Sequence, residues 1–199
     1  MQQVVIINGG TTFDSKKEYY DYLKNIQIDK DRLLTKTDWK QTIARDLGDK
    51  YEVLLPRMPN TADAHYEEWK LYFESVSKIL DDQVILIGHS LGGIFLAKYL
   101  SENQAQFKIK SLILLAAPIQ DTADESLGDF RLTKDFTNLI KQVTNIHILH
   151  SQDDPVVPVA DAQLYKKQLP TATLTLINDK AHLNTETFPE LITVIKNIS

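Results

Sequence analysis

The sequence predicts an α/β protein: a three-layer α/β/α sandwich around a six-stranded, mostly parallel sheet of order 2-1-3-4-5-6. Short apolar, β-branched runs alternate with longer segments of helical periodicity, which is typical of parallel strands joined by helical crossovers. Two of the runs, Ile85-Leu86-Ile87 and Leu112-Ile113-Leu114-Leu115, are apolar without alternation. Such runs indicate central strands that helices cover on both faces.

The expected elements follow in order along the chain. Strands are predicted near Val4–Asn8, Glu52–Leu55, Gln83–Ile87, Ser111–Ala116, Asn145–His150 and Thr173–Ile177. Helices are predicted near Lys16–Ile26, Asp38–Leu47, Tyr66–Leu80, Leu91–Ser101, Lys134–Val143, Pro158–Leu169 and Thr187–Asn197.

The first predicted helix carries an apolar stripe, in which Tyr19, Tyr22, Leu23 and Ile26 recur at i, i+3, i+4 and i+7. Stripes of this kind on surface helices usually face the core, so we expect core packing here. A wall for a ligand is the alternative.

Composition limits the classes of protein. With 199 residues, 43% of them apolar, residues 1–199 fit one domain with a substantial core. The net charge of −5 and the absence of a basic stripe argue against nucleic acid as a partner. The chain has no cysteine, which excludes disulfides, thiol nucleophiles and thiolate metal sites, and fits a reducing compartment. The run Val4–Ile7 is too short for a signal peptide or membrane span, so we expect a cytoplasmic protein.

A G-x-S-x-G motif follows an apolar strand and leads into a helical segment, in the run Val84-Ile85-Leu86-Ile87-Gly88-His89-Ser90-Leu91-Gly92-Gly93. This context is that of a nucleophile elbow, in which a sharp turn lifts the serine hydroxyl above the sheet edge. Gly88 and Gly92 fit such a turn because a Cβ there would collide with neighbouring backbone. A pentapeptide arising by chance would lack the strand and the helix. Ser90 is therefore the candidate nucleophile.

A serine nucleophile needs a histidine base and an orienting carboxylate, in the chain order serine, acid, histidine. Asp153 and Asp154 follow the fifth predicted strand, and His182 follows the sixth. We favour Asp154 because Pro155 restrains it to extended conformations, although Asp-Pro is also a common turn and Asp153 remains open. Among the five histidines, only His182 lies in a loop after both aspartates. We expect the other four to be structural or to lie at the surface: His65, His89, His147 and His150.

The oxyanion hole needs two backbone N–H groups, one of them from the residue after the nucleophile, Leu91. In the predicted strand order, the loop after the first strand lies beside Ser90, and it contains Asn8-Gly9-Gly10-Thr11. Gly10 is the best second donor. A plain turn is the alternative, whereas no phosphate-binding glycine motif occurs in the chain.

Taken together, these residues resemble the α/β-hydrolase family, in particular its small lidless members related to retinoblastoma-binding protein nine and the bacterial YdeN-type hydrolases. The resemblance covers most of the chain, in the segments Val4–Gly10, Pro56–Asn60 with Glu68-Trp69, Gly88–Gly93, Ser151–Pro155 and Ala181-His182. It implies an α/β-hydrolase fold without a large cap, and it places the acid on Asp154. Asn8 stands where many relatives have histidine. The segment from about Phe13 to Thr37 is longer than in those relatives and can shape the acyl or leaving-group pocket.

These observations predict a serine hydrolase, esterase-like, that cleaves a small ester or related acyl substrate through an acyl-enzyme. No cofactor or metal is required, and nothing indicates a membrane or protein partner. With few residues left for a lid, short acyl esters are expected to react best. The alternatives are a catalytically weak binding protein of the same fold, and a peptidase or amidase that uses the same triad.

Overall fold

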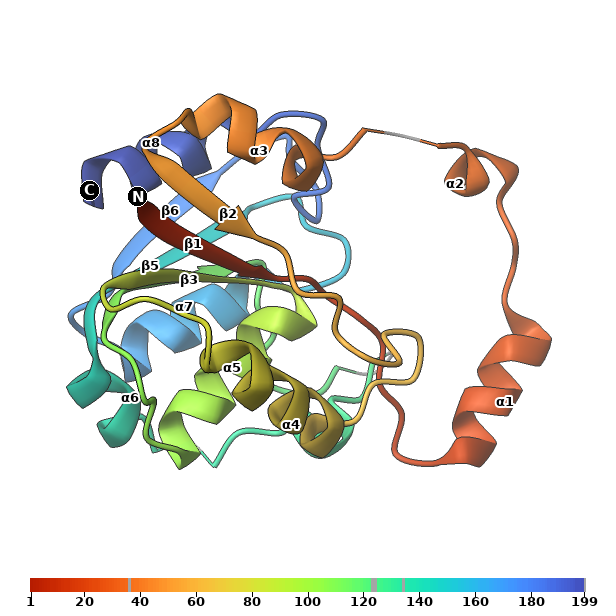
Figure 1. Ribbon diagram of the computed structural model, residues 1–199. Helices are drawn as coiled ribbons and strands as arrows, with labels where there is room; N and C mark the ends of the chain where they lie inside the picture. Colours follow the sequence, from red (N-terminus) through yellow and green to blue (C-terminus); the bar gives the residue numbers. More distant parts are fainter. Residues whose placement is uncertain (36, 123–124, 134, 199) are drawn as a thin grey trace.

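The computed structural model describes residues 1–35, 37–122, 125–133 and 135–198. Six strands form one sheet, in which every neighbouring pair is parallel (Figure 1). Its order is β2-β1-β3-β4-β5-β6, which confirms the prediction. The strands are β1 (Gln2–Ile7), β2 (Tyr51–Leu54), β3 (Val84–His89), β4 (Ile109–Leu115), β5 (Val143–Ser151) and β6 (Thr173–Ile177).

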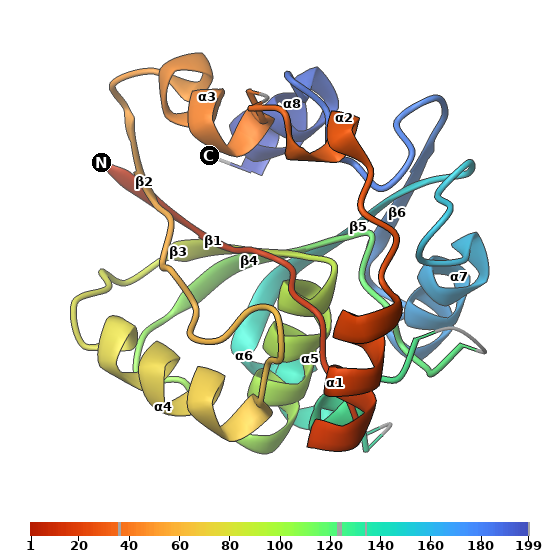
Figure 2. The same cartoon turned by 90° about the vertical axis from the view of Figure 1, so that its right-hand side faces the viewer.

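Helices cover both faces of the sheet (Figures 1 and 2). One face carries α3 (Trp39–Leu47) and α8 (Pro189–Ile198). The other carries α4 (Tyr66–Ser77), α5 (Leu91–Glu102), α6 (Thr137–Gln142) and α7 (Val159–Gln168), with the 3-10 helix η1 (Gly128–Phe130). Among the helices of the described residues, none is long and apolar enough to cross a membrane.

The two cores follow from the period of two along each strand. In β1, Val5 and Ile7 point into the core beneath α4 and α5, whereas Val4 and Ile6 point into the core beneath α3 and α8. Both faces of the central strands are therefore buried, which explains their unbroken apolar runs. Polar side chains gather instead at the carboxyl ends of the strands, where the loops begin.

Several predicted bounds differ from the structure by up to three residues. The helix expected near Lys134–Val143 spans only Thr137–Gln142, and its expected first residue, Lys134, lies outside the described residues. Val143 already belongs to β5, where it pairs with Ile109, and the side-chain NH₂ of Gln142 donates to Leu100 O at 2.8 Å and Asn103 O at 2.9 Å. The short helix α2 (Lys30–Leu33) was not predicted.

Residues 13–35, which we call the arm, leave β1 and carry α1 (Lys16–Asn25) and α2 away from the body of the domain (Figures 1 and 2). No residue of α1 is buried, and Tyr22 and Leu23 are 43% and 47% exposed. The prediction that the α1 stripe packs against the core is therefore wrong. Periodicity shows that a helix has an apolar face, but not what lies opposite that face.

Candidate active site

Ser90 lies in a tight turn between β3 and α5. Its backbone adopts φ 54° and ψ −125°, a conformation that non-glycine residues rarely occupy and that the surrounding contacts must hold. Ser90 N–H donates to Leu115 O at 2.8 Å, and Ser90 O accepts from Gly93 N–H at 2.8 Å. The strand, turn and helix are those that the G-x-S-x-G motif predicts.

The two motif glycines are required by close backbone contacts. A Cβ on Gly88 would lie 2.4 Å from Gly92 O, and a Cβ on Gly92 would lie 2.2 Å from Ile7 O. Gly93, to which the sequence assigned no function, would place a Cβ 2.5 Å from the side chain of Ala117. These contacts seat the start of α5 against β1 and against the segment after β4.

Asp154 and His182 are brought together from two different loops. His182 Nδ1 lies 2.9 Å from Asp154 Oδ2 and 3.1 Å from Asp154 Oδ1. The Asp154 side chain is fully buried, and Oδ1 also accepts the N–H groups of Val156 at 2.8 Å and Val157 at 3.0 Å. A buried carboxylate with these donors is fixed in direction and can accept a hydrogen bond from a protonated Nδ1.

Asp153 has a different environment. It is exposed, its Oδ1 accepts from Ser151 Oγ, and its Oδ2 accepts the Ala181 N–H at 3.3 Å. The hydrogen bond from Ser151 lowers the pKa of Asp153. Asp153 thus connects the loop after β5 to the loop that carries His182. Among the described residues, the carboxylate that is hydrogen-bonded to the His182 ring is that of Asp154.

Two buried side chains fix the His182 loop by hydrogen bonds to its backbone carbonyl groups. His89 Nε2 lies 2.9 Å from His182 O, and Trp39 Nε1–H donates to Leu183 O at 2.8 Å. Burial, with the nearby charge of Lys40, keeps the pKa of His89 well below its usual value. A neutral His89 must donate through Nε2 to this carbonyl. Trp39 lies 143 positions before His182, and no local signal in the sequence marks its function.

The remaining histidines lie away from Ser90. His150 is buried behind Asp154, with Nε2 2.9 Å from Val157 O, and His147 is a half-buried residue of β5. His65 precedes α4 and lies between two carboxylates. Among the described residues, no group of three or more histidine and acidic side chains is placed to hold a metal ion.

The loop after β1 approaches the nucleophile closely. A Cβ on Gly9 would lie 2.9 Å from Ser90 Cβ, so glycine is needed there. The loop is fixed because Thr11 N–H donates to Thr61 O and Thr11 O accepts from Ala64 N–H, both at 2.8 Å. Leu91 is the first residue of α5, where the backbone N–H has no carbonyl partner within the helix.

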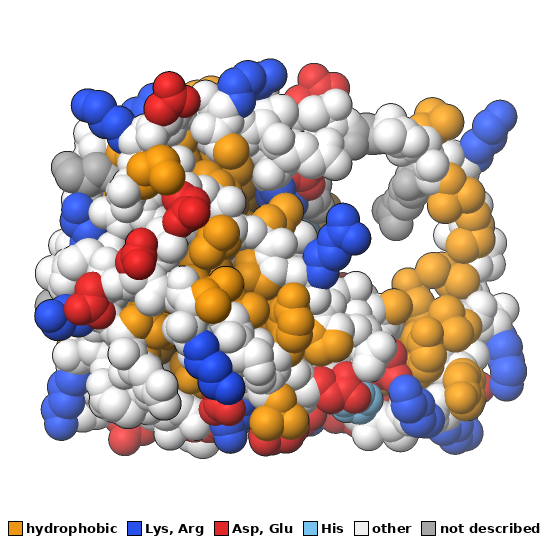
Figure 3. Space-filling model, in the orientation of Figure 1, with side chains coloured by type: hydrophobic (Ala, Val, Ile, Leu, Met, Phe, Trp, Pro, Cys, Tyr) orange, Lys and Arg blue, Asp and Glu red, His pale blue; other side chains and the backbone are white. Residues whose placement is uncertain are grey.

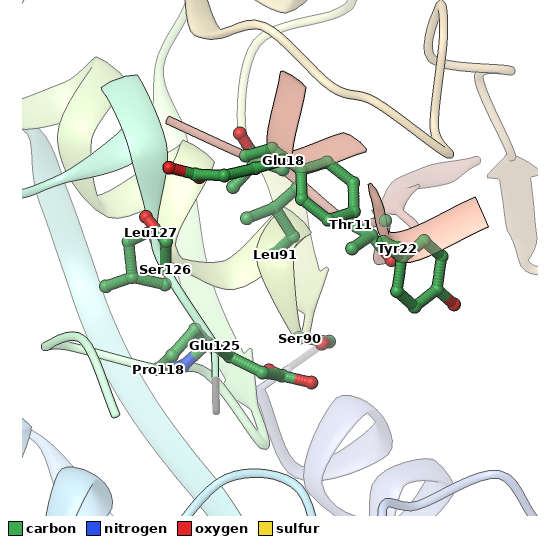
Figure 4. A pocket seen from close by; sticks show the side chains of 12 residues that line it. Thr11, Glu18, Tyr22, Ser90, Leu91, Pro118, Glu125, Ser126 and Leu127 are labelled. Carbon is green, nitrogen blue, oxygen red and sulfur yellow. The ribbon is translucent and has the colours of Figure 1, made fainter. Parts of the chain in front are cut away.

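Ser90 lines two cavities, and Gly10, Thr11 and Glu125 also line both. The first has a volume of about 260 Å³ and is lined by Leu91 and by Phe13, Glu18 and Tyr22 of the arm (Figure 4). The second, of about 390 Å³, is lined by His182, Lys40, Asn8 and Asn184. Asn8 Oδ1 is buried there without a hydrogen-bond partner within the described residues.

Comparison with known proteins identifies the family. A model of the family described as "Serine hydrolase" matches residues 34–193. The chain belongs to the serine hydrolase family. The serine hydrolase RBBP9 of Rattus norvegicus is 29% identical over 151 residues, which cover 74% of this chain and 78% of that protein.

Solved structures have the same fold as this serine hydrolase. The ydeN gene product of B. subtilis has a TM-score of 0.73 at 18% identity, with 100% of this chain and 98% of that chain covered. A putative YdeN-like hydrolase from Pectobacterium atrosepticum has a TM-score of 0.66 at 16% identity, with 98% and 90% covered. These likenesses confirm the α/β-hydrolase fold that the sequence predicted.

Proposed function

We propose that this serine hydrolase is an esterase that acts on a small ester or related acyl substrate, with Ser90, Asp154 and His182 as its catalytic triad. One observation carries the proposal: His182 is hydrogen-bonded to buried Asp154 at 2.9 Å and lines the same cavity as Ser90. When Nδ1 of a neutral imidazole donates to the carboxylate, Nε2 is left without a proton and can accept one.

The reaction follows from these positions. Ser90 Oγ bonds to the carbonyl carbon while its proton moves to His182 Nε2, and the Gly10 and Leu91 N–H groups stabilise the oxyanion. His182 then gives the proton to the departing alcohol, which leaves Ser90 acylated. A water, deprotonated by His182, then bonds to the acyl carbon. The bond from this carbon to Ser90 Oγ breaks, and His182 returns the proton to Oγ as the acid leaves. Asp154 holds the tautomer and stabilises the imidazolium throughout.

Hydrolysis of p-nitrophenyl butyrate tests the proposal. Ser90→Ala is expected to lower kcat by roughly 10³-fold or more, because the substitution removes the hydroxyl on which the acyl-enzyme forms. Ser75→Ala is the matched control, since Ser75 is an exposed serine of α4 that lines neither cavity beside Ser90, and turnover should stay within a few-fold of wild type.

Three results would contradict the proposal. Equal rates for wild type and Ser90→Ala would remove Ser90 from the reaction. A faster rate on the matched p-nitroanilide would favour a peptidase or amidase. No turnover of any ester by the folded protein would favour a binding protein with a hydrolase fold.

A further inference from the structure

The arm presents an apolar surface that the fold does not use. On α1 and the residues that follow it, Ile26, Ile28 and Leu33 are 38%, 65% and 70% exposed. Figure 3 shows hydrophobic side chains gathered on the arm, with an opening between the arm and the body of the domain. Contiguous exposed apolar surface in a folded protein often marks a binding site.

This apolar surface is continuous with the Ser90 cavity. Tyr22 lines the cavity that contains Ser90 and Leu91. Tyr22 also lines a separate hollow of about 490 Å³, whose other walls include Ile26, Ile28 and Leu33. An extended apolar group can therefore run from Ser90, past the Tyr22 ring, onto the inner side of the arm.

The position of Tyr22 is fixed at the base of the arm. The Phe13 ring lies 5.3 Å from the Tyr22 ring and 5.3 Å from the Tyr19 ring, within the range of favourable aromatic contacts. Lys16 forms an ion pair with Asp63, whose side chain is only 8% exposed. Arg131 binds Asp14 at 2.7 Å, which ties the start of the arm to the segment after η1.

The proton transfers assign the two cavities to the two halves of an ester. The leaving oxygen must receive its proton from His182, so the leaving group lies in the cavity that His182 lines. The acyl group then extends into the first cavity, toward Leu91 and Tyr22. Glu18 borders the first cavity alone and Glu125 borders both cavities, and these carboxylates disfavour an anionic acyl group.

We infer that the arm is the acyl-binding site of this enzyme and that it takes an uncharged, straight acyl chain of medium length, with Tyr22 and Ile26 as specificity-determining residues. The inference rests on the proposed function for the orientation of the ester. It replaces the expectation that short acyl esters react best, because that expectation assumed an open crevice without additional apolar surface. An acyl chain of about eight carbons would transfer its apolar surface from water onto the arm when it binds.

The test is a series of p-nitrophenyl esters from acetate to octanoate, each below its critical micelle concentration. A methylene fully removed from water raises kcat/KM about fourfold, and about twofold is expected along this half-open surface. Octanoate has six methylenes more than acetate, so the octanoate to acetate ratio of kcat/KM should be about 60 in wild type. Tyr22→Ala should lower this ratio about fivefold. Tyr20→Ala should not change it, since Tyr20 lies on the same helix and lines neither the Ser90 cavity nor the arm hollow.

A binding measurement separates this inference from the proposed function. N-methyloctanamide should bind Ser90→Ala at least about tenfold more tightly than N-methylacetamide, and Tyr22→Ala in that background should remove most of the difference. If Ser90→Ala binds the amides in this way but the wild-type protein hydrolyses no ester, the proposed function would be overturned and the acyl site would stand. A Ser90-dependent esterase whose chain-length ratio is flat and unaffected by Tyr22→Ala would overturn the acyl site alone. A dimer that Tyr22→Ala dissociates, with the same flat ratio, would assign the apolar surface to a second copy of the chain.

Discussion

Asp154→Asn is the substitution whose effect follows most directly from the geometry. Asp154 Oδ1 accepts two backbone N–H groups, from Val156 at 2.8 Å and Val157 at 3.0 Å, so the asparagine carbonyl oxygen must remain there. The asparagine NH₂ then replaces Oδ2, which lies 2.9 Å from His182 Nδ1. An NH₂ group can only donate, so Nδ1 must accept and the imidazole proton moves to Nε2.

With its proton on Nε2, His182 can no longer take the proton of Ser90. Loss of the correct tautomer costs roughly 10⁴-fold in kcat in a serine protease triad, which corresponds to about 5 kcal/mol of transition-state stabilisation. We expect a loss of this size for Asp154→Asn. The assay is steady-state hydrolysis of p-nitrophenyl butyrate at pH 8, with thermal unfolding to check that the variant is folded.

Asp153→Asn is the matched control, one position earlier in the same loop. Asp153 is exposed, and an asparagine oxygen can keep one of its two contacts, those with Ser151 Oγ and Ala181 N–H. Its kcat should stay within about fivefold of wild type. Equal losses in the two folded variants, or a larger loss in Asp153→Asn, would refute the assignment of the acid to Asp154.

Two further substitutions test the structural basis of the site. The lowered pKa of His89 means that the unfolded chain binds a proton that the folded protein excludes, so the free energy of unfolding should fall by up to about 1.4 kcal/mol per pH unit below pH 6.5. His89→Gln should flatten this slope in urea titrations, and an unchanged slope would contradict the buried neutral histidine. Gly92→Ala, which would place a Cβ 2.2 Å from Ile7 O, should cost about 3 kcal/mol or more of stability. Gly48→Ala, where a Cβ would meet no atom within 4 Å but the backbone has φ 85° and ψ −179°, should cost about 2 kcal/mol from backbone strain alone, and a larger loss there than in Gly92→Ala would count against the packing of the turn.

The sheet could be predicted because its signals are local. An unbroken apolar run such as Ile85-Leu86-Ile87 is favourable in a strand only when helices cover both faces of the sheet. The glycines of the turn mark positions where a Cβ would lie less than 3 Å from neighbouring atoms. The pairing of Asp154 with His182 also followed from the chain order of the motif, since parallel strands deliver their following loops to one edge.

The parts that were missed depend on contacts between distant segments. The stripe on α1 has the spacing of a core helix, yet its partner is solvent and the Ser90 cavity rather than the sheet. Val143 fits the apolar pattern of a helix end as well as that of a strand, and the pairing with Ile109 decides for β5. The hydrogen bond from Trp39 to Leu183 joins positions 144 residues apart, and no pattern of residues in the sequence predicts it.

Fluorophosphonate labelling, followed by intact mass and peptide mapping, tests the central claim most directly. The reagent phosphonylates a serine only where a base activates it and an oxyanion site receives the charge. We expect one adduct on wild type, mapped to Ser90, none on Ser90→Ala, and labelling slowed by orders of magnitude in Asp154→Asn. Labelling of Ser90→Ala at the wild-type rate, or no labelling of the folded wild-type protein, would contradict the account.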